Sequence, residues 1–140
     1  MNEDQITLVQ ESFAKVAPIT ESAAGIFYAD LFATAPEVRP LFKGNMDEQG
    51  MKLMTTLGVV VKGLRDFDKI VPVAEGLAVR HVAYGVEPAH YDAVGASLLR
   101  TLEQGLGSEY TPAVDAAWRD AYATLATVMK AAAYGPEAAQ

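Results

Sequence analysis

The 140-residue sequence contains no cysteine, only two histidines and a single tryptophan. Without cysteine the chain has neither disulfides nor thiolate metal ligands, which is typical of proteins in a reducing cytoplasm. No apolar run approaches the roughly eighteen residues of a membrane-spanning helix, and the acidic, polar segment 1–5 is unlike a secretory signal. We therefore expect a cytoplasmic protein that does not enter a membrane.

Basic residues are also scarce, because 11 lysines and arginines stand against 18 acidic residues, for a net charge of −7. This charge argues against nucleic acid and anionic membranes as partners. The sequence has no internal repeat, low-complexity tract or linker, and its length suits one domain with a substantial core. We expect a single domain over residues 1–140, with 135–140 as a disordered tail.

Apolar residues recur with the spacing of helices along almost the whole chain, and no stretch alternates convincingly with the period of a strand. Asp4 is the expected N-cap of the first helix and Thr111 that of the last, while Pro72 is expected in a first turn. The class is therefore all-α, with about seven helices in a compact, bundle-like packing. The predicted helical ranges are 4–16, 20 to at least 32, 36–42, 46–64, 70–83, 88–107 and 112–134.

His81 stands in an otherwise apolar helical segment, at the end of a stripe formed by Ile70, Val73 and Leu77. A neutral imidazole on such a face is typical of a haem iron ligand. The ring nitrogen that faces away from the iron could then donate to the carbonyl of Leu77, one turn earlier, and fix the tautomer. The alternative is a hydrogen-bonded core histidine, which is the more common role of a buried histidine. His90 is the one other imidazole in the chain.

The helix over 46–64 carries a mixed face, on which Gln49, Lys52 and Leu53 lie together. An amide, a cation and an apolar side chain on one face suit the lining of a ligand pocket, although an ordinary amphipathic helix edge has the same mixture. Lys52, and likewise Arg80 beside the histidine, could meet carboxylates such as haem propionates or remain solvated.

Two aromatic residues stand out in the first third of the chain. Tyr28 lies in an apolar helix, so its hydroxyl needs a partner, which could be Gln49 or a bound ligand. Phe42 follows a turn that begins at Pro36, an arrangement that can drive one ring into a pocket wall. The alternative for Phe42 is an ordinary core position.

Taken together, these residues give a sequence that resembles the globins. It is especially similar to single-domain bacterial globins and to the haem domain of flavohaemoglobins, with stretches of its second half similar to neuroglobin. The resemblance covers about residues 4–134, and the 32 residues from Gln49 to His81 match the family's usual distance between the distal and proximal positions. The segments that carry it are 27–28, 35–42, 80–81, 88–95 and 117–122, with 102–107 and 110–112 for neuroglobin.

The resemblance implies a globin fold that encloses a pocket for haem b. By it, His81 is the proximal iron ligand and Phe42 is the ring stacked on the haem. Tyr28 and Gln49 take the polar distal positions, and Leu53 forms the apolar distal wall. The other expected haem contacts are Lys52, Leu77, Arg80, Val86, Tyr91 and Val94.

The sequence departs from the family pattern at two places. Gln49 stands where many globins have a distal histidine, so ligation of the iron by two histidines is not expected. Tyr91 is in register with a proximal tyrosine of flavohaemoglobins, but Ala133 replaces the glutamate of their charge relay. A neutral partner should make the imidazole donate less electron density to iron, which favours reversible ligand binding over O–O cleavage. His90 is not the family's ligand and is expected at the surface or in a loop.

The resemblance implies a globin that reversibly binds O₂, CO and NO on ferrous iron, with Tyr28 and Gln49 as hydrogen-bond donors, for oxygen binding, storage or transport. One alternative is nitric oxide dioxygenation. We expect no reductase domain in addition to the globin domain, so this activity would need a separate reductase, and whether the chain is an enzyme by itself stays open. Another alternative is a haem-free interaction module with a globin fold, which would leave the combination of Tyr28, Gln49, Phe42 and His81 unexplained. A gas sensor is a further possibility.

Overall fold

The computed structural model describes residues 2–42 and 44–135, and within them it contains helices and no strand. This confirms the all-α class. The six α-helices, with the short 36–42 segment as a 3₁₀ helix, account for the seven predicted helical ranges. The α-helices are α1 (Glu3–Val16), α2 (Thr20–Thr34), α3 (Met46–Lys62), α4 (Phe67–Ala83), α5 (Pro88–Leu106) and α6 (Pro112–Tyr134). The 3₁₀ helices are η1 (Ala17–Ile19), η2 (Pro36–Leu41), η3 (Leu64–Asp66) and η4 (Gly107–Glu109).

Capping explains where α1 and α6 begin. The Asn2 side chain accepts a hydrogen bond from the backbone N–H of Gln5 at 2.8 Å, and the Gln5 side chain accepts one from the Asn2 N–H. The predicted cap at Asp4 is therefore wrong, because the helix begins one residue earlier and Asp4 lies in its first turn. At the other end of the chain, Thr111 caps α6 through the N–H of Val114, as predicted.

Helix α4 begins earlier than the sequence indicates, because the 3₁₀ turn η3 runs directly into Phe67. Pro72 is consequently in the second turn and not in the first, so that prediction is wrong. Since proline has no N–H, the carbonyl of Asp68 loses its usual donor within the helix. Pro72 is exposed, and water can reach that part of the helix.

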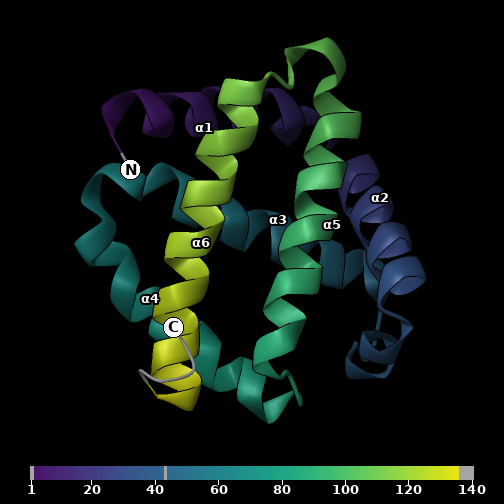
Figure 1. Ribbon diagram of the computed structural model, residues 1–140. Coiled ribbons are helices and arrows are strands. Elements are labelled where there is room, and N and C mark those ends of the chain that lie inside the picture. Colours follow the sequence, from purple (N-terminus) through teal and green to yellow (C-terminus); the bar gives the residue numbers. More distant parts are fainter. Residues whose placement is uncertain (1, 43, 136–140) are drawn as a thin grey trace.

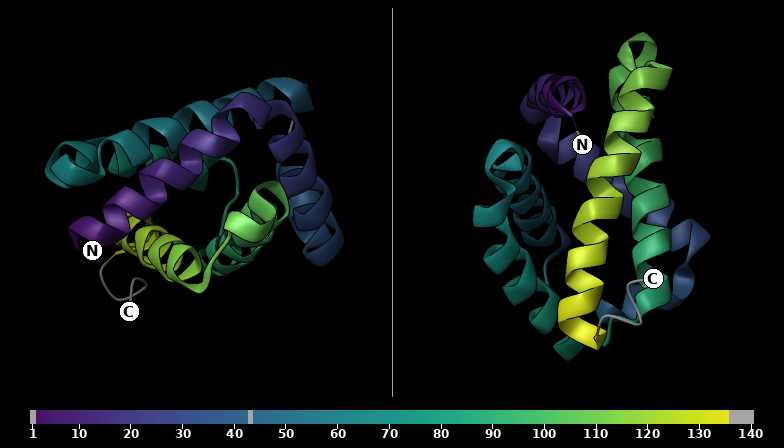
Figure 2. Two further views of the ribbon diagram at one scale, coloured as in Figure 1. Left: turned by 90° about the horizontal axis from the view of Figure 1, so that it is seen from above. Right: turned by 60° about the vertical axis from the view of Figure 1, so that its left-hand side comes forward.

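The helices pack in pairs around a long antiparallel pair, α5 and α6 (Figure 1). Helix α2 packs on α5, α4 packs on α6, and α1 crosses α6 near its start. Helix α3 packs on both α1 and α2, and it runs beside α1 when the molecule is viewed from above (Figure 2). Helix α3, which carries Gln49 and Leu53, and helix α4, which carries His81, therefore attach to different parts of the bundle.

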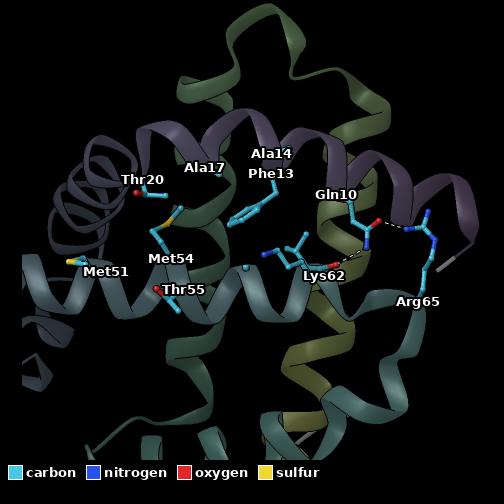
Figure 3. A pocket seen from close by; sticks show the side chains of 12 residues that line it. Gln10, Phe13, Ala14, Ala17, Thr20, Met51, Met54, Thr55, Lys62 and Arg65 are labelled. Carbon is cyan, nitrogen blue, oxygen red and sulfur yellow. Dashed lines mark hydrogen bonds between the residues drawn. The ribbon is translucent and has the colours of Figure 1, made fainter.

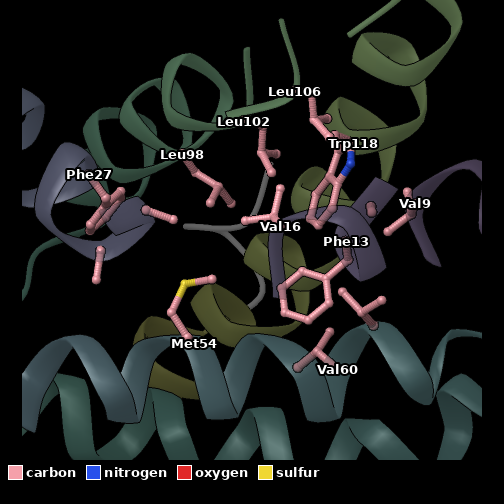
Figure 4. Close-up of a cluster of buried hydrophobic side chains, with 14 of the residues drawn as sticks. Val9, Phe13, Val16, Phe27, Met54, Val60, Leu98, Leu102, Leu106 and Trp118 are labelled. Atoms are coloured by element: carbon pink, nitrogen blue, oxygen red, sulfur yellow. The ribbon is translucent and has the colours of Figure 1, made fainter. Parts of the chain in front are cut away.

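Two clusters of buried side chains divide the interior. The main cluster joins α1, α2, α3, α5 and α6, and its largest fully buried side chain is Trp118 (Figure 4). The Trp118 indole N–H donates to the Ser12 hydroxyl at 2.8 Å, so the polar edge of the ring is paired inside the core. A second, smaller cluster around Tyr91 holds α4 against α6 and the start of α5. Helix α4 thus stands largely outside the main core.

Within the described residues, no helix is both long and apolar enough to cross a lipid bilayer. The predicted tail over 135–140 lies outside the described residues, except for Gly135, which follows α6.

Candidate functional site

The imidazole of His81 is held in one orientation by its own helix. Its Nδ1 lies 2.6 Å from the backbone carbonyl oxygen of Leu77, which confirms the predicted hydrogen bond one turn back. A carbonyl can only accept, so Nδ1 carries the proton and Nε2 carries the free lone pair. His81 is half-buried, and its Nε2 makes no hydrogen bond to any residue in 2–42 or 44–135. The ring therefore presents an available nitrogen ligand with a fixed tautomer.

The buried face of α4 differs from the predicted stripe. Ala74 and Ala78 are fully buried against α6, and Ile70 is buried at the start of the same face. Val73, which the sequence places on the same stripe as Leu77 and His81, is 43% exposed and lies outside this buried face. The small side chains of the two alanines let α4 approach α6 closely, which moves the centre of the buried face toward them.

Three aromatic rings meet where α2 faces the end of η2. Tyr28 stacks on Phe32 with ring centroids 5.8 Å apart, and the ring of Phe42 makes edge contacts with both at 5.3 and 5.4 Å. Arg39 donates to the carbonyl of Phe42 at 3.1 Å, which fixes the chain at the point where this ring leaves it. Phe42 is half-buried, so its ring closes one side of the aromatic cluster without being enclosed.

The Tyr28 hydroxyl is a neutral donor in apolar surroundings. The side chain is 8% exposed, and burial raises its pKa to about 12, so it stays protonated at neutral pH. It has no hydrogen-bond partner in the described part of the chain, so the suggestion that Gln49 pairs with it is not borne out.

Helix α3 begins against this tyrosine. A Cβ added at Gly50 would lie 2.8 Å from Cβ of Ala24 and 3.8 Å from Cε2 of Tyr28, so glycine is needed for the close approach of α3 to α2. Gln49 precedes this glycine and is half-buried, as is Leu53 one turn later. The structure thus places the start of α3 beside Tyr28.

Tyr91 is the centre of the second cluster. Leu77, Val86 and Ala133 pack against the cluster that contains this tyrosine, and the position assigned to the relay glutamate carries only a methyl group. The Tyr91 hydroxyl is fully buried and has no partner among the described residues. Burial, with a contribution from Tyr134, raises its pKa to about 12.

A tight turn brings the element of Phe42 to the end of α4. Gly85 has φ +92°, and a Cβ there would lie 3.2 Å from Cδ2 of Leu41. The N–H of Val86 donates to the carbonyl of His81 at 3.1 Å, so the turn is tied to the histidine itself. The ends of η2 and α4 are therefore neighbours, which places Phe42 and His81 at the same end of the molecule.

The remaining residues predicted to contact haem lie at the surface or pack on the main cluster. Lys52 and Arg80 are exposed and form no ion pair with the described residues, and Val94 packs against the main cluster. His90 lies in the first turn of α5 and not in a loop, where its Nδ1 accepts from the Glu87 N–H at 3.0 Å. Nδ1 of His90 therefore caps the start of α5. Whether His90 binds a metal is not tested by this hydrogen bond, so its assignment as a non-ligand stays a prediction.

Two aromatic neighbours were not predicted as site residues. Phe32 stacks on Tyr28, and its place one turn later on the same helix is a signal that could have found it. Tyr134 makes an edge contact with Tyr91 at 6.5 Å and donates to the carbonyl of Val86. Tyr134 lies on a different helix from Tyr91, so no spacing within one helix could have predicted their contact.

The donor set fits a haem. No three histidine, cysteine, aspartate or glutamate side chains within 2–42 and 44–135 come together to hold a metal ion, so His81 would have to share an iron with ligands that the described chain does not supply. A haem iron takes one axial histidine from the protein. The Tyr91 and Tyr28 hydroxyls, both without partners in the described chain, are further polar groups that a bound molecule would satisfy.

Comparison with known proteins gives one consistent family. The family model described as Globin matches residues 26–129. A flavohemoprotein of Rhodopirellula baltica is 29% identical over 131 residues, and one of Pseudomonas putida is 31% identical over 134. These alignments cover 91% and 92% of this chain but only 32% and 34% of the relatives, so the chain spans about a third of their length.

A solved structure has the same fold. It is an engineered carbene transferase, a putative nitric oxide dioxygenase from Rhodothermus marinus, and it superposes with a TM-score of 0.86. The match covers 95% of this chain and 93% of that one at 23% sequence identity. At this level of identity the likeness shows the fold alone.

Proposed function

The chain belongs to the globin family, and on that premise we propose that it binds haem b through Nε2 of His81 and reversibly binds O₂, CO and NO. The observation that carries the proposal is the hydrogen bond from Nδ1 of His81 to the Leu77 carbonyl, which leaves Nε2 free to bind metal. A bound haem would supply an iron that can bind a diatomic gas. We also place the protein in the cytoplasm, since it lacks cysteine.

The proximal contacts support reversible binding. The Leu77 carbonyl is a neutral acceptor, and the Ala133 methyl offers no carboxylate to the Tyr91 cluster. An imidazole with a neutral partner is a weaker electron donor than one that shares its proton with a carboxylate. Among the described residues, the position that we assign to the relay glutamate therefore carries no carboxylate, which favours reversible binding over O–O cleavage.

The distal role of Tyr28 follows from its burial. Its hydroxyl is protonated at neutral pH and has no partner in the described chain, so it can donate to a polar gas ligand. The rings of Phe32 and Phe42 keep the surroundings apolar, and a hydrogen bond is stronger in such a medium than in water. We assign Gln49 as a second distal donor and Leu53 as the apolar wall.

The remaining contacts would hold the edge of the haem. The Tyr91 hydroxyl is the buried polar group that most needs a partner, and Leu77 and Val86 give its cluster an apolar surface. Lys52 and Arg80 are exposed cations that can meet the propionates, and Val94 is the last of the proposed contacts.

Nitric oxide dioxygenation is a second candidate, favoured by the names of the relatives. In this reaction NO, O₂ and one electron give nitrate. We propose that a reductase supplies this electron. The chain matches only about a third of the length of its flavohemoprotein relatives. Measuring nitrate over many rounds of NO addition, with and without an added reductase, separates sustained turnover from a single stoichiometric reaction.

The absorption spectrum tests the proposal, and the two histidines supply a matched pair of variants. We expect the reduced, haem-supplied protein to show visible bands that shift with CO, and His90→Ala to behave in the same way. His81→Ala should lose the histidine-ligated bands. A wild-type protein that retains no haem would overturn the proposal in favour of an interaction module.

A further inference from the structure

A groove of about 800 Å³ runs between α1 and α3, on the outside of the main core (Figure 3). Its volume lies in the usual range for small-molecule sites. Phe13 and Met54 form its apolar floor, and the small residues Ala14 and Gly58 keep it open. Met51, at one end, is 72% exposed, which is unusual for a methionine on a helix that packs on two others.

The other end of the groove is closed by polar groups. Gln10 on α1 donates to the carbonyl of Val61 at 2.9 Å and accepts from Arg65, so the two helices are joined there. Arg65 is also bound to Glu3 and Thr7. An elongated ligand would therefore enter from the Met51 end and stop at this contact.

The groove carries positive charge in an acidic protein. None of the described residues that line it has a carboxylate, although the chain as a whole has a net charge of −7. Lys62 extends along the groove toward Phe13, and its ammonium forms no ion pair with residues in the described ranges (Figure 3). Arg65 has partners, so Lys62 is the cation available to a ligand.

The groove lies on the side of α3 opposite the proposed distal residues. At about 100° per residue, Met51, Gly58 and Lys62 fall within about 40° of one another around the helix. Gln49 and Leu53 lie about 160–200° away from Met51 on the same scale. The groove is thus separate from the proposed haem pocket, and whatever binds there does not compete with a gas ligand.

We propose that this groove binds a free single-chain amphiphile with an anionic head, such as a long-chain carboxylate. The head lies at Lys62, and the tail passes over Phe13 and Met54 toward Met51. Met51 and Lys62 are eleven residues apart on one helix, about 16 Å, which suits a saturated chain of about a dozen carbons. Exposed methionines adapt their shape to flexible apolar ligands. The net charge of the protein opposes binding to an anionic membrane, so the ligand is taken from solution.

Dodecanoate, below its micelle concentration, is the probe, and methionine methyl groups labelled with ¹³C report where it binds. We expect saturable NMR shifts of the Met51 and Met54 methyls, in the protein with and without added haem. Met129, buried in the cluster around Tyr91, should not respond. Dodecyltrimethylammonium, with the same tail and a cationic head, should bind more weakly.

Two pairs of variants locate the head and the tail. Ala14→Glu places a carboxylate in the groove and should weaken binding about tenfold or more, whereas Ala33→Glu, on the exposed side of α2, should not. Lys62→Met should weaken binding about two- to fivefold, since an exposed ion pair is weak, and Lys69→Met on α4 should leave it unchanged.

Three results would overturn the proposal, and each is specific to the groove. They are the absence of saturable shifts at Met51 and Met54, unchanged binding of dodecanoate in Ala14→Glu, and equal affinity for the cationic amphiphile. A shift of Met129 together with a change in the haem spectrum would place the probe in the haem pocket instead. Because the titration is read with and without added haem, failure of the proposed function leaves this test intact.

Discussion

Replacing Tyr28 by phenylalanine isolates a single hydroxyl group. The ring stays in place in the variant, because Phe27, Phe32 and Phe42 surround it with centroids 5.2–5.8 Å away. Since the pKa of Tyr28 is raised to about 12, the group that is removed is a protonated donor at any pH used for the assay. In the ligand-free protein this hydroxyl has no partner among the described residues, so its loss should not reduce stability.

The size of the effect on O₂ follows from the strength of one hydrogen bond. A hydrogen bond to an acceptor that carries charge contributes about 1.5–3 kcal/mol, which corresponds to about a ten- to hundredfold faster release of O₂. Stopped-flow displacement of O₂ by CO measures this rate. Urea denaturation measures the free energy of unfolding, which should be unchanged or slightly higher than in the wild type.

Tyr110→Phe is the matched control. Its hydroxyl donates to Asp115 near the start of α6, far along the chain from the proposed pocket, so its loss should lower stability by about 1 kcal/mol and leave O₂ release unchanged. If Tyr28→Phe releases O₂ at the wild-type rate, the hydroxyl does not act on the ligand and the distal assignment is refuted.

Three further predictions concern packing, the proximal side and acid stability. Gly50→Ala should lower the free energy of unfolding by about 1–3 kcal/mol, because the added Cβ would lie 2.8 Å from Cβ of Ala24 on α2. Gly76→Ala should raise the free energy of unfolding by about 0.5–1 kcal/mol, because an added Cβ there meets nothing within 4 Å. Urea denaturation of both variants measures these two changes. Ala133→Glu should restore a carboxylate to the Tyr91 cluster and increase peroxidase activity, and unchanged activity would argue against the register. The hydrogen bond from Arg100 lowers the pKa of Asp30 below its ordinary value. The contribution of Asp30 to stability is therefore present above that ordinary pKa and is lost as the pH falls through the lowered one. Urea denaturation at several acidic pH values should show that Asp30→Asn loses less stability on acidification than the wild type.

The sequence was informative wherever a feature depends on one helix alone. The hydrogen bond between His81 and Leu77 could be predicted because helix geometry places the carbonyl four residues back within reach of the ring. Thr111 could be predicted as a cap because a hydroxyl followed by Pro112 suits a helix start. At the other end of the chain, Asn2 and Asp4 are both good caps, and local pattern did not separate them.

Features that depend on the packing between helices were harder to predict. The buried face of α4 centres on Ala74 and Ala78, whose small side chains carry little hydrophobic signal in the sequence. The start of α4 at Phe67 depends on a 3₁₀ turn that the apolar period does not show. The groove near Lys62 requires the relative placement of α1 and α3, which no spacing within one helix can give.

The central claim is that Nε2 of His81 binds the haem iron while Nδ1 donates to Leu77. Resonance Raman spectroscopy of the ferrous, ligand-free protein measures the stretching band between iron and the histidine nitrogen. We expect this band to move when histidine is labelled with ¹⁵N, to lie at the low frequency of an imidazole bonded to a carbonyl, and to persist in His90→Ala. A band that persists in His81→Ala, or that is lost in His90→Ala, would contradict the account.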